Sequence, residues 1–287
     1  MLSVLDIFRI GIGPSSSHTV GPMRIARRFV RALEKASGLD KVARVAVELQ
    51  GSLALTGVGH GTVDASILGL AGFQADRTDP DKAADTLAGI RETNRLMLGG
   101  KREIAFDPKA DIDLAGHIIP DLHPNGMVLR AYDKAGGILL ERTYFSTGGG
   151  FVASEAQLRR PPKDDRVKAG ADVPHPFGSA KELLALCAEH DLTVADLILA
   201  NEDAMRPREG TIAGLDRIAA AMDQCIDRGL HQRGILPGGL KVARRAPDLW
   251  DKLSANPQSN EREQLFDWLN CYAMAVNEEN AAGGRVV

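Results

Sequence analysis

The chain lacks a large excess of either charge: its 287 residues include 35 lysines and arginines against 38 aspartates and glutamates. It also lacks a basic block and any basic stretch interleaved with aromatic residues, which argues against nucleic-acid binding. No apolar run is long enough to cross a bilayer. The apolar part of the N-terminal MLSVLDIFRIGIG is too short for a signal peptide, and no cleavage pattern follows it. We therefore expect a soluble cytoplasmic protein that binds neither nucleic acid nor a membrane.

Cysteine is scarce. Cys187, Cys225 and Cys271 lie far apart and form no CxxC pair, which excludes a disulfide framework and fits a reducing compartment. Each lies in an apolar pattern with helical spacing. Because free cysteine packs like a small hydrophobic residue, we predict that all three are buried in the core and that none is a metal ligand.

Several catalytic signatures are missing as well. The sequence contains no GxxxxGK[ST], no GxGxxG opening a helix after a strand, and no GxSxG, so neither a phosphate loop nor an α/β-hydrolase serine is indicated. Lys181 and Lys241 do not lie in the glycine-rich setting that a Schiff-base lysine needs for pyridoxal phosphate. A pyridoxal-phosphate enzyme is therefore a weak alternative.

Strand and helix signals alternate up to about residue 155, which predicts an α+β domain over 1–155. PMRIARRFVRALEKASG (22–38) has Pro22 in the first turn and an apolar face, as expected of a helix. RVAVELQG alternates like a strand. Further helices are expected at 63–71 and 82–98. A pair of strands joined by a turn at 134–137 then leads into a glycine run.

The composition changes after residue 155. Proline and charge without periodicity predict a linker over 156–178. The rest, 179–287, is predicted to be helical. Ser179 with Glu182 forms a capping-box pattern, and Thr193 is a second cap. One helix is expected to end at Gly229, and another is expected over about 261–280.

Four clusters have more hydroxyl, amide or glycine groups than a scaffold requires: SSSHT (15–19), GVGHGT (57–62), STGGG (146–150) and VNEENAAGG (276–284). Each also has an ordinary interpretation, as a cap, a solvated loop, a flexible turn or an exposed helix end. Taken together, hydroxyls, amides and backbone N–H groups can hold a small zwitterion. An imidazole can then move a proton at neutral pH.

The sequence closely resembles the single-chain iron–sulfur L-serine dehydratases of bacteria over its whole length. IGIGPSSSHTVGPM, GSLALTGVGHGT, HPNGM, YFSTGGGF, VPHPFGSAKELLALC, CIDRGL, LPGGLKVARRA and AVNEENAAGGRVV all look like segments of that family, in the family's order. The resemblance implies a beta-chain-type α+β domain followed by an incomplete alpha-chain-type helical domain. It also implies conversion of L-serine to pyruvate and ammonia without pyridoxal phosphate.

The resemblance further implies a [4Fe–4S] cluster acting as a Lewis acid, whose cysteine ligands are expected beyond residue 287, and a homodimer. It assigns proton transfer to His60, with His18 and Ser146 as further catalytic groups. The residues expected to bind substrate are Ser15, Ser16, Ser17, Thr19, Gly148, Asn277 and Glu278. Because the family continues past GGRVV, we expect this chain to lack a C-terminal part. A serine-binding or regulatory module without a cluster and without catalysis is the alternative.

Overall fold

The computed structural model describes residues 3–160, 172–237, 241–255 and 261–287. The chain forms two compact units. One consists of Met1–Arg9, Pro161–Met222 and Val287, and the other of Ile10–Arg160 and Asp223–Val286. Residues 161–171 of the expected linker lie outside the described residues, but its start does not: α7 (Glu155–Arg159) is a short helix with a capping box between Ser154 and Gln157. The domain boundaries expected from the sequence stay a prediction.

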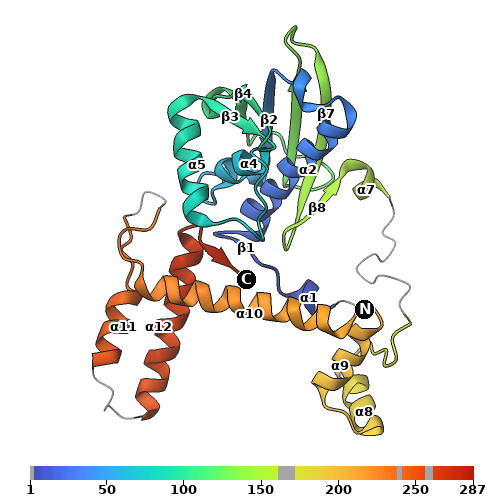
Figure 1. Cartoon of the computed structure of the whole chain (residues 1–287), viewed down its shortest axis with the longest axis vertical. Helices are drawn as coiled ribbons and strands as arrows, with labels where there is room; N and C mark the ends of the chain where they lie inside the picture. Colours follow the sequence, from blue (N-terminus) through green and yellow to red (C-terminus); the bar gives the residue numbers. More distant parts are fainter. Residues whose placement is uncertain (1–2, 161–171, 238–240, 256–260) are drawn as a thin grey trace. The chain divides into compact units, whose positions relative to one another are not determined.

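A mixed sheet of five strands is the centre of the larger unit (Figure 1). Its strands, in spatial order, are β5 (Ile112–Ala115), β2 (Arg44–Gln50), β6 (Gly126–Tyr132), β7 (Ile138–Gly148) and β8 (Phe151–Ser154). Only the β2–β5 pair is parallel. Val45, Val47 and Leu49 of β2 are buried, so the alternation that predicted this strand is confirmed.

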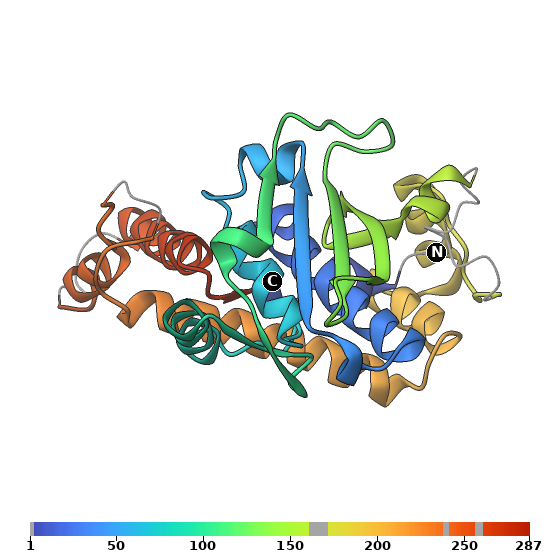
Figure 2. The same cartoon turned by 90° about the horizontal axis from the view of Figure 1, so that it is seen from above.

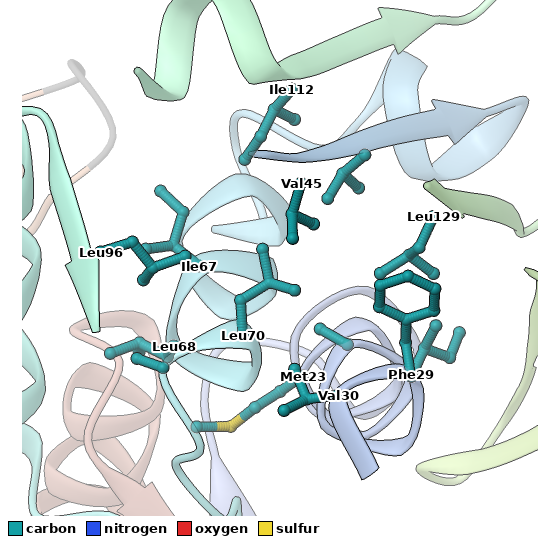
Figure 3. Packing of buried hydrophobic residues seen from close by; sticks show 14 of the residues in the cluster. Met23, Phe29, Val30, Val45, Ile67, Leu68, Leu70, Leu96, Ile112 and Leu129 are labelled. Atoms are coloured by element: carbon teal, nitrogen blue, oxygen red, sulfur yellow. The ribbon is translucent and has the colours of Figure 1, made fainter. Parts of the chain in front are cut away.

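Two helices, α2 (Gly21–Ala36) and α4 (Thr62–Leu70), cover one face of this sheet (Figure 2). Phe29 and Val30 of α2 and Ile67 and Leu70 of α4 meet residues of the sheet in a continuous apolar core (Figure 3). Gly69 allows the two helices to approach closely, because a Cβ atom there would lie 2.3 Å from the carbonyl oxygen of Met23. Both helices were expected from the sequence.

The prediction of a helix over 82–98 is wrong at the C-terminal end. α5 spans Pro80–Thr93, and Asn94 then adopts a left-handed conformation with φ of 51°. The chain continues as β3 (Arg95–Leu98), which pairs with β4 (Arg102–Ala105). Leu96 and Leu98 are buried and alternate with the exposed Arg95 and Met97, so this segment follows the two-residue period of a strand.

The remaining elements of the first 160 residues are short. They are α1 (Val4–Ile7), β1 (Gly11–Ile12), a π-helical turn (Ser16–Val20), a 3₁₀ turn (Leu39–Lys41), α3 (Ser52–Leu55) and α6 (Pro108–Asp111). The described residues after 172 are mainly helical, as expected. Their elements are α8 (Ala180–His190), α9 (Val194–Asp203), α10 (Arg208–His231), α11 (Ala246–Ala255), α12 (Glu261–Ala281) and the short β9 (Arg285–Val286). No helix in the described ranges is long and apolar enough to span a bilayer.

Three local predictions in the helical part have different outcomes. Ser179 and Thr193 do cap α8 and α9. The expected helix end at Gly229 is wrong, because α10 continues to His231. The glycine instead allows close packing, since a Cβ atom there would lie 2.2 Å from the carbonyl oxygen of Ala275 in α12. Cys225 and Cys271 are buried as expected, whereas Cys187 is only half-buried.

Candidate functional site

The hydroxyl-rich segment of residues 15–20 forms a single π-helical turn that leads directly into α2. Ser15 is the N-cap, and its Oγ accepts a hydrogen bond from the backbone N–H of His18 at 3.1 Å. The backbone N–H of Ser15 donates to Oγ1 of the buried Thr19 at 3.2 Å. Ser16 is exposed. Part of this unusual composition therefore closes the turn on itself, which fixes the backbone of His18.

Both ring nitrogens of His18 contact hydroxyl groups. Nδ1 lies 2.8 Å from Oγ of Ser17, and Nε2 lies 3.0 Å from Oγ of Ser52. A hydroxyl can donate or accept, so these contacts are compatible with either neutral tautomer. Burial, followed by the proximity of His60, lowers the pKa of His18, and hydrogen bonding to the backbone of Ser52 opposes this shift. The neutral imidazole is the favoured form.

His60 lies beside His18, with 5.0 Å between the ring centroids. Its Nδ1 is 2.9 Å from the backbone carbonyl oxygen of Thr56. A carbonyl can only accept, so Nδ1 carries the hydrogen and the neutral ring has its lone pair on Nε2. Thr19 fixes the backbone here, since its Oγ1 donates to the carbonyl oxygen of His60 at 2.7 Å. Two histidines from distant segments, both expected at the site, thus lie together.

Ser146 supports the π-helical turn. Its side chain is completely buried, and its Oγ donates to the carbonyl oxygen of Ser17 at 2.6 Å. Gly21 makes this approach possible, because a Cβ atom there would lie 2.1 Å from the Ser146 Oγ. Asn125 fixes Ser146 in turn through two hydrogen bonds to its backbone, at 3.0 and 3.1 Å. In this geometry the Ser146 hydroxyl holds the turn in place.

The glycine run after Ser146 forms a tight bend. Gly148, Gly149 and Gly150 all have positive φ, at 92°, 55° and 70°, a conformation that side-chain-bearing residues rarely adopt. Arg24 of α2 donates through Nη1 to the carbonyl oxygen of Gly150 at 2.7 Å. The bend is therefore anchored to the helix that follows the π-helical turn.

The end of α12 reaches the same region, but through a different residue from those expected. Nδ2 of Asn280 donates to the carbonyl oxygen of Pro14 at 3.2 Å, and β1 pairs with β9 beside it. Asn277 is exposed. The carboxylate of Glu278 accepts from the backbone N–H groups of Arg245 and Ala246, so it caps the start of α11.

Three residues of the site were not singled out from the sequence: Ser52, Thr56 and Asn125. The first two, together with His60, recur at intervals of four, which is the spacing of one helical turn. That spacing in SLALTGVGH is a signal that could have identified them. Asn125 carries no comparable local pattern, because its contact with Ser146 depends on the pairing of β6 with β7.

The described cysteines do not fit an iron–sulfur cluster. Among the residues whose placement is described, no three His, Cys, Asp or Glu side chains converge in a way that could hold a metal. Burial raises the pKa of Cys225 to about 11 and also raises the pKa of Cys271, with Glu279 and Glu278 adding to the respective shifts. The thiolate that binds iron is thus disfavoured at both positions.

Comparisons with known proteins agree on one family. The family described as serine dehydratase beta chain matches residues 3–157, and the family described as serine dehydratase alpha chain matches residues 189–287. An L-serine dehydratase of Streptomyces coelicolor is 47% identical over 287 residues, and L-serine dehydratase 1 of Escherichia coli is 42% identical over 289 residues. Each alignment covers 100% of this chain but 62% of the relative, so the chain spans less than two thirds of the relatives' length.

Proposed function

The chain belongs to the serine dehydratase family, and from that premise we propose that it takes part in the dehydration of L-serine to pyruvate and ammonia. The observation that carries the proposal is the pair formed by His18 and His60. Its hydroxyl-rich surroundings suit a small polar substrate, and one imidazole nitrogen of the pair, Nε2 of His60, is oriented as a base. The names of the relatives support the same reaction.

In this proposal His60 removes the Cα proton of L-serine. The Nδ1–H of His60 is held by Thr56, so the proton is accepted at Nε2. The Cα–H electron pair forms the Cα–Cβ double bond while the Cβ–O bond breaks, and the departing hydroxide takes up the proton that His60 accepted and leaves as water. The product, 2-aminoacrylate, tautomerises to an imine, and water hydrolyses the imine to pyruvate and ammonia. The protein's own contribution is thus a positioned base.

Substrate binding falls to the turn and to the end of α12. The exposed Ser16 and the half-buried Ser17 are the hydroxyls of the turn best placed to meet the polar groups of L-serine. Ser15, Thr19 and Ser146 are committed to hydrogen bonds within the protein, and we assign them to holding the site. Gly148 and Asn277 complete the proposed binding set, whereas Glu278 is assigned to capping α11.

Members of this family are generally iron–sulfur dependent. The described cysteines do not fit a [4Fe–4S] cluster, so no step of the proposal passes through one. A cytoplasmic homodimer, implied by the resemblance, belongs to the proposal as well. Binding of L-serine without turnover is a second candidate function, favoured by the same poor fit.

The test compares the wild-type chain with His60→Gln. We expect wild type to bind L-serine in calorimetry and to form pyruvate. We expect His60→Gln to keep its affinity for L-serine and to lose on the order of 10²–10⁴-fold in kcat, the usual contribution of a general base. His117→Gln, a change at an exposed histidine, is the matched control and should behave like wild type.

Each contrary result is informative. Equal kcat in His60→Gln and wild type would contradict the assignment of His60 as the base. A wild-type chain that binds L-serine and forms no pyruvate would support the second candidate. A chain that does neither would contradict both candidates.

A further inference from the structure

Both imidazoles of the candidate site are connected to one short helix. α3 begins at Ser52, whose Oγ contacts Nε2 of His18 at 3.0 Å. The carbonyl oxygen of Ser52 accepts from both the N–H and the Oγ1 of Thr56, at 3.1 and 2.9 Å. The carbonyl oxygen of Thr56 in turn accepts from Nδ1 of His60. A single helical turn thus connects the two rings.

The position of Ser52 is itself firmly set by the backbone. Its N–H donates to the carbonyl oxygen of Pro124 at 3.0 Å. Gly51, just before it, has φ of 52° and lies so close to Pro124 that a Cβ atom would be 2.3 Å from the same oxygen. The Ser52 hydroxyl is therefore held by a fixed backbone, and a fixed partner can orient a ring that would otherwise turn about its side-chain bonds.

The two histidines differ in what holds them. A backbone carbonyl, which cannot move far or change its hydrogen-bonding role, fixes His60. The ring nitrogens of His18 contact side-chain hydroxyls, and the Ser17 hydroxyl is itself within 3.3 Å of the Ser15 hydroxyl. Ser52 is thus the hydrogen-bond partner that ties the His18 ring to a segment outside its own turn.

We propose that Ser52 is a positioning residue, which orients the imidazole of His18 against that of His60 through its hydroxyl. The role rests on the proposed function, because it matters for catalysis only if His60 is the base. Without the hydroxyl, the His18 ring turns away and the surroundings of the base change. The expected consequence is slower proton transfer with little change in substrate affinity.

Nuclear magnetic resonance of the ¹⁵N-histidine-labelled chain tests the orientation without needing turnover. In Ser52→Ala we expect the ring signals of His18 to shift and His60 to keep its Nδ1–H tautomer. Ser52→Thr retains a hydroxyl and should restore the wild-type His18 signals. Ser66→Ala is the matched control, because it removes a buried hydroxyl that donates to the backbone carbonyl of Thr62 and not to either ring.

Kinetics supplies the second readout. We expect Ser52→Ala to lower kcat on the order of 10–100-fold, as small misplacements do, with KM near wild type and with recovery in Ser52→Thr. His18 signals that are the same in Ser52→Ala as in wild type would overturn the proposal. So would an equal loss in the alanine and threonine variants, which would reveal a packing role. If the wild-type chain forms no pyruvate, the proposed function fails while the resonance data still decide the role of Ser52.

Discussion

At the scale of single residues, the two histidines of the site differ in their hydrogen-bond partners. His60 faces a carbonyl oxygen, which fixes its tautomer, and His18 faces two hydroxyls, which do not. Two cationic rings with centroids 5.0 Å apart would repel each other, so the proximity of His60 contributes to the lowered pKa of His18. The neutral state of the pair is the state in which His60 can accept a proton.

This pairing predicts a pH dependence of stability. Because burial and His60 lower the pKa of His18, the unfolded chain takes up a proton at the ordinary value of 6.5 while the folded chain resists it. The free energy of unfolding should therefore fall as pH drops below 6.5, until the folded His18 also titrates. Urea unfolding across this range should show a shallower pH dependence for His18→Gln than for wild type. An unchanged slope would contradict the assignment, and His117→Gln should keep the wild-type slope.

The sequence predicted both histidines of this pair but not the residues that hold them in place. His18 and His60 each lie in a cluster that is notable for its polar composition, and the family resemblance then assigned both imidazoles to the site. Ser146 was expected to act on substrate, yet its hydroxyl is turned to the Ser17 carbonyl and completely buried. A hydroxyl's direction depends on the backbone of a distant strand, so composition cannot reveal whether it faces substrate or scaffold.

At the scale of elements, local patterns predicted helices well where one signal dominated. α2 has a proline in its first turn and an apolar face. The predicted helix extended beyond the end of α5 because LML continues the apolar pattern. Over only four residues, that pattern is compatible with the period of a helix and with that of a strand. Asn94, which takes a left-handed conformation, ended the helix there. The role of Gly229 was also missed. A residue without a Cβ atom is required there because α12 packs closely against it, and nothing in the sequence of its own helix indicates this.

Gly229 gives a prediction for the packing of α10 on α12. In a helix interior, alanine is normally more favourable than glycine by roughly 1 kcal/mol. At this position the added Cβ would lie 2.2 Å from the Ala275 carbonyl oxygen, so we expect Gly229→Ala to lower the free energy of unfolding by about 1–3 kcal/mol through overpacking. In α5, a Cβ atom added at Gly89 would meet no neighbouring atom within 4 Å, and Gly89→Ala should be neutral or stabilising. Thermal unfolding measures both, and a Gly229→Ala chain as stable as wild type would contradict the close contact.

At the scale of the whole molecule, the larger unit gathers segments from both ends of the chain. Residues near 13 meet residues near 284: the N–H of Gly13 donates to the carbonyl oxygen of Gly284 at 2.9 Å. A Cβ atom at Gly13 would lie 1.9 Å from the carbonyl oxygen of Asn280, which excludes any larger residue there without rearrangement. The sequence could place GIGP and NEEN in one site only through resemblance, because such pairings arise from tertiary structure.

The environment of the two buried cysteines in this unit leads to a prediction about iron binding. Cys225 and Cys271 are buried in helices, and their raised pKa values disfavour the thiolates that a cluster requires. After anaerobic reconstitution with iron and sulfide, we expect the 287-residue chain to hold far less than the about four irons of a [4Fe–4S] cluster. The Cys225→Ala/Cys271→Ala double variant should match wild type in iron and sulfide content. About four irons per chain in wild type, lost in the double variant, would show that these thiols are ligands and that the helices around them rearrange to bind metal.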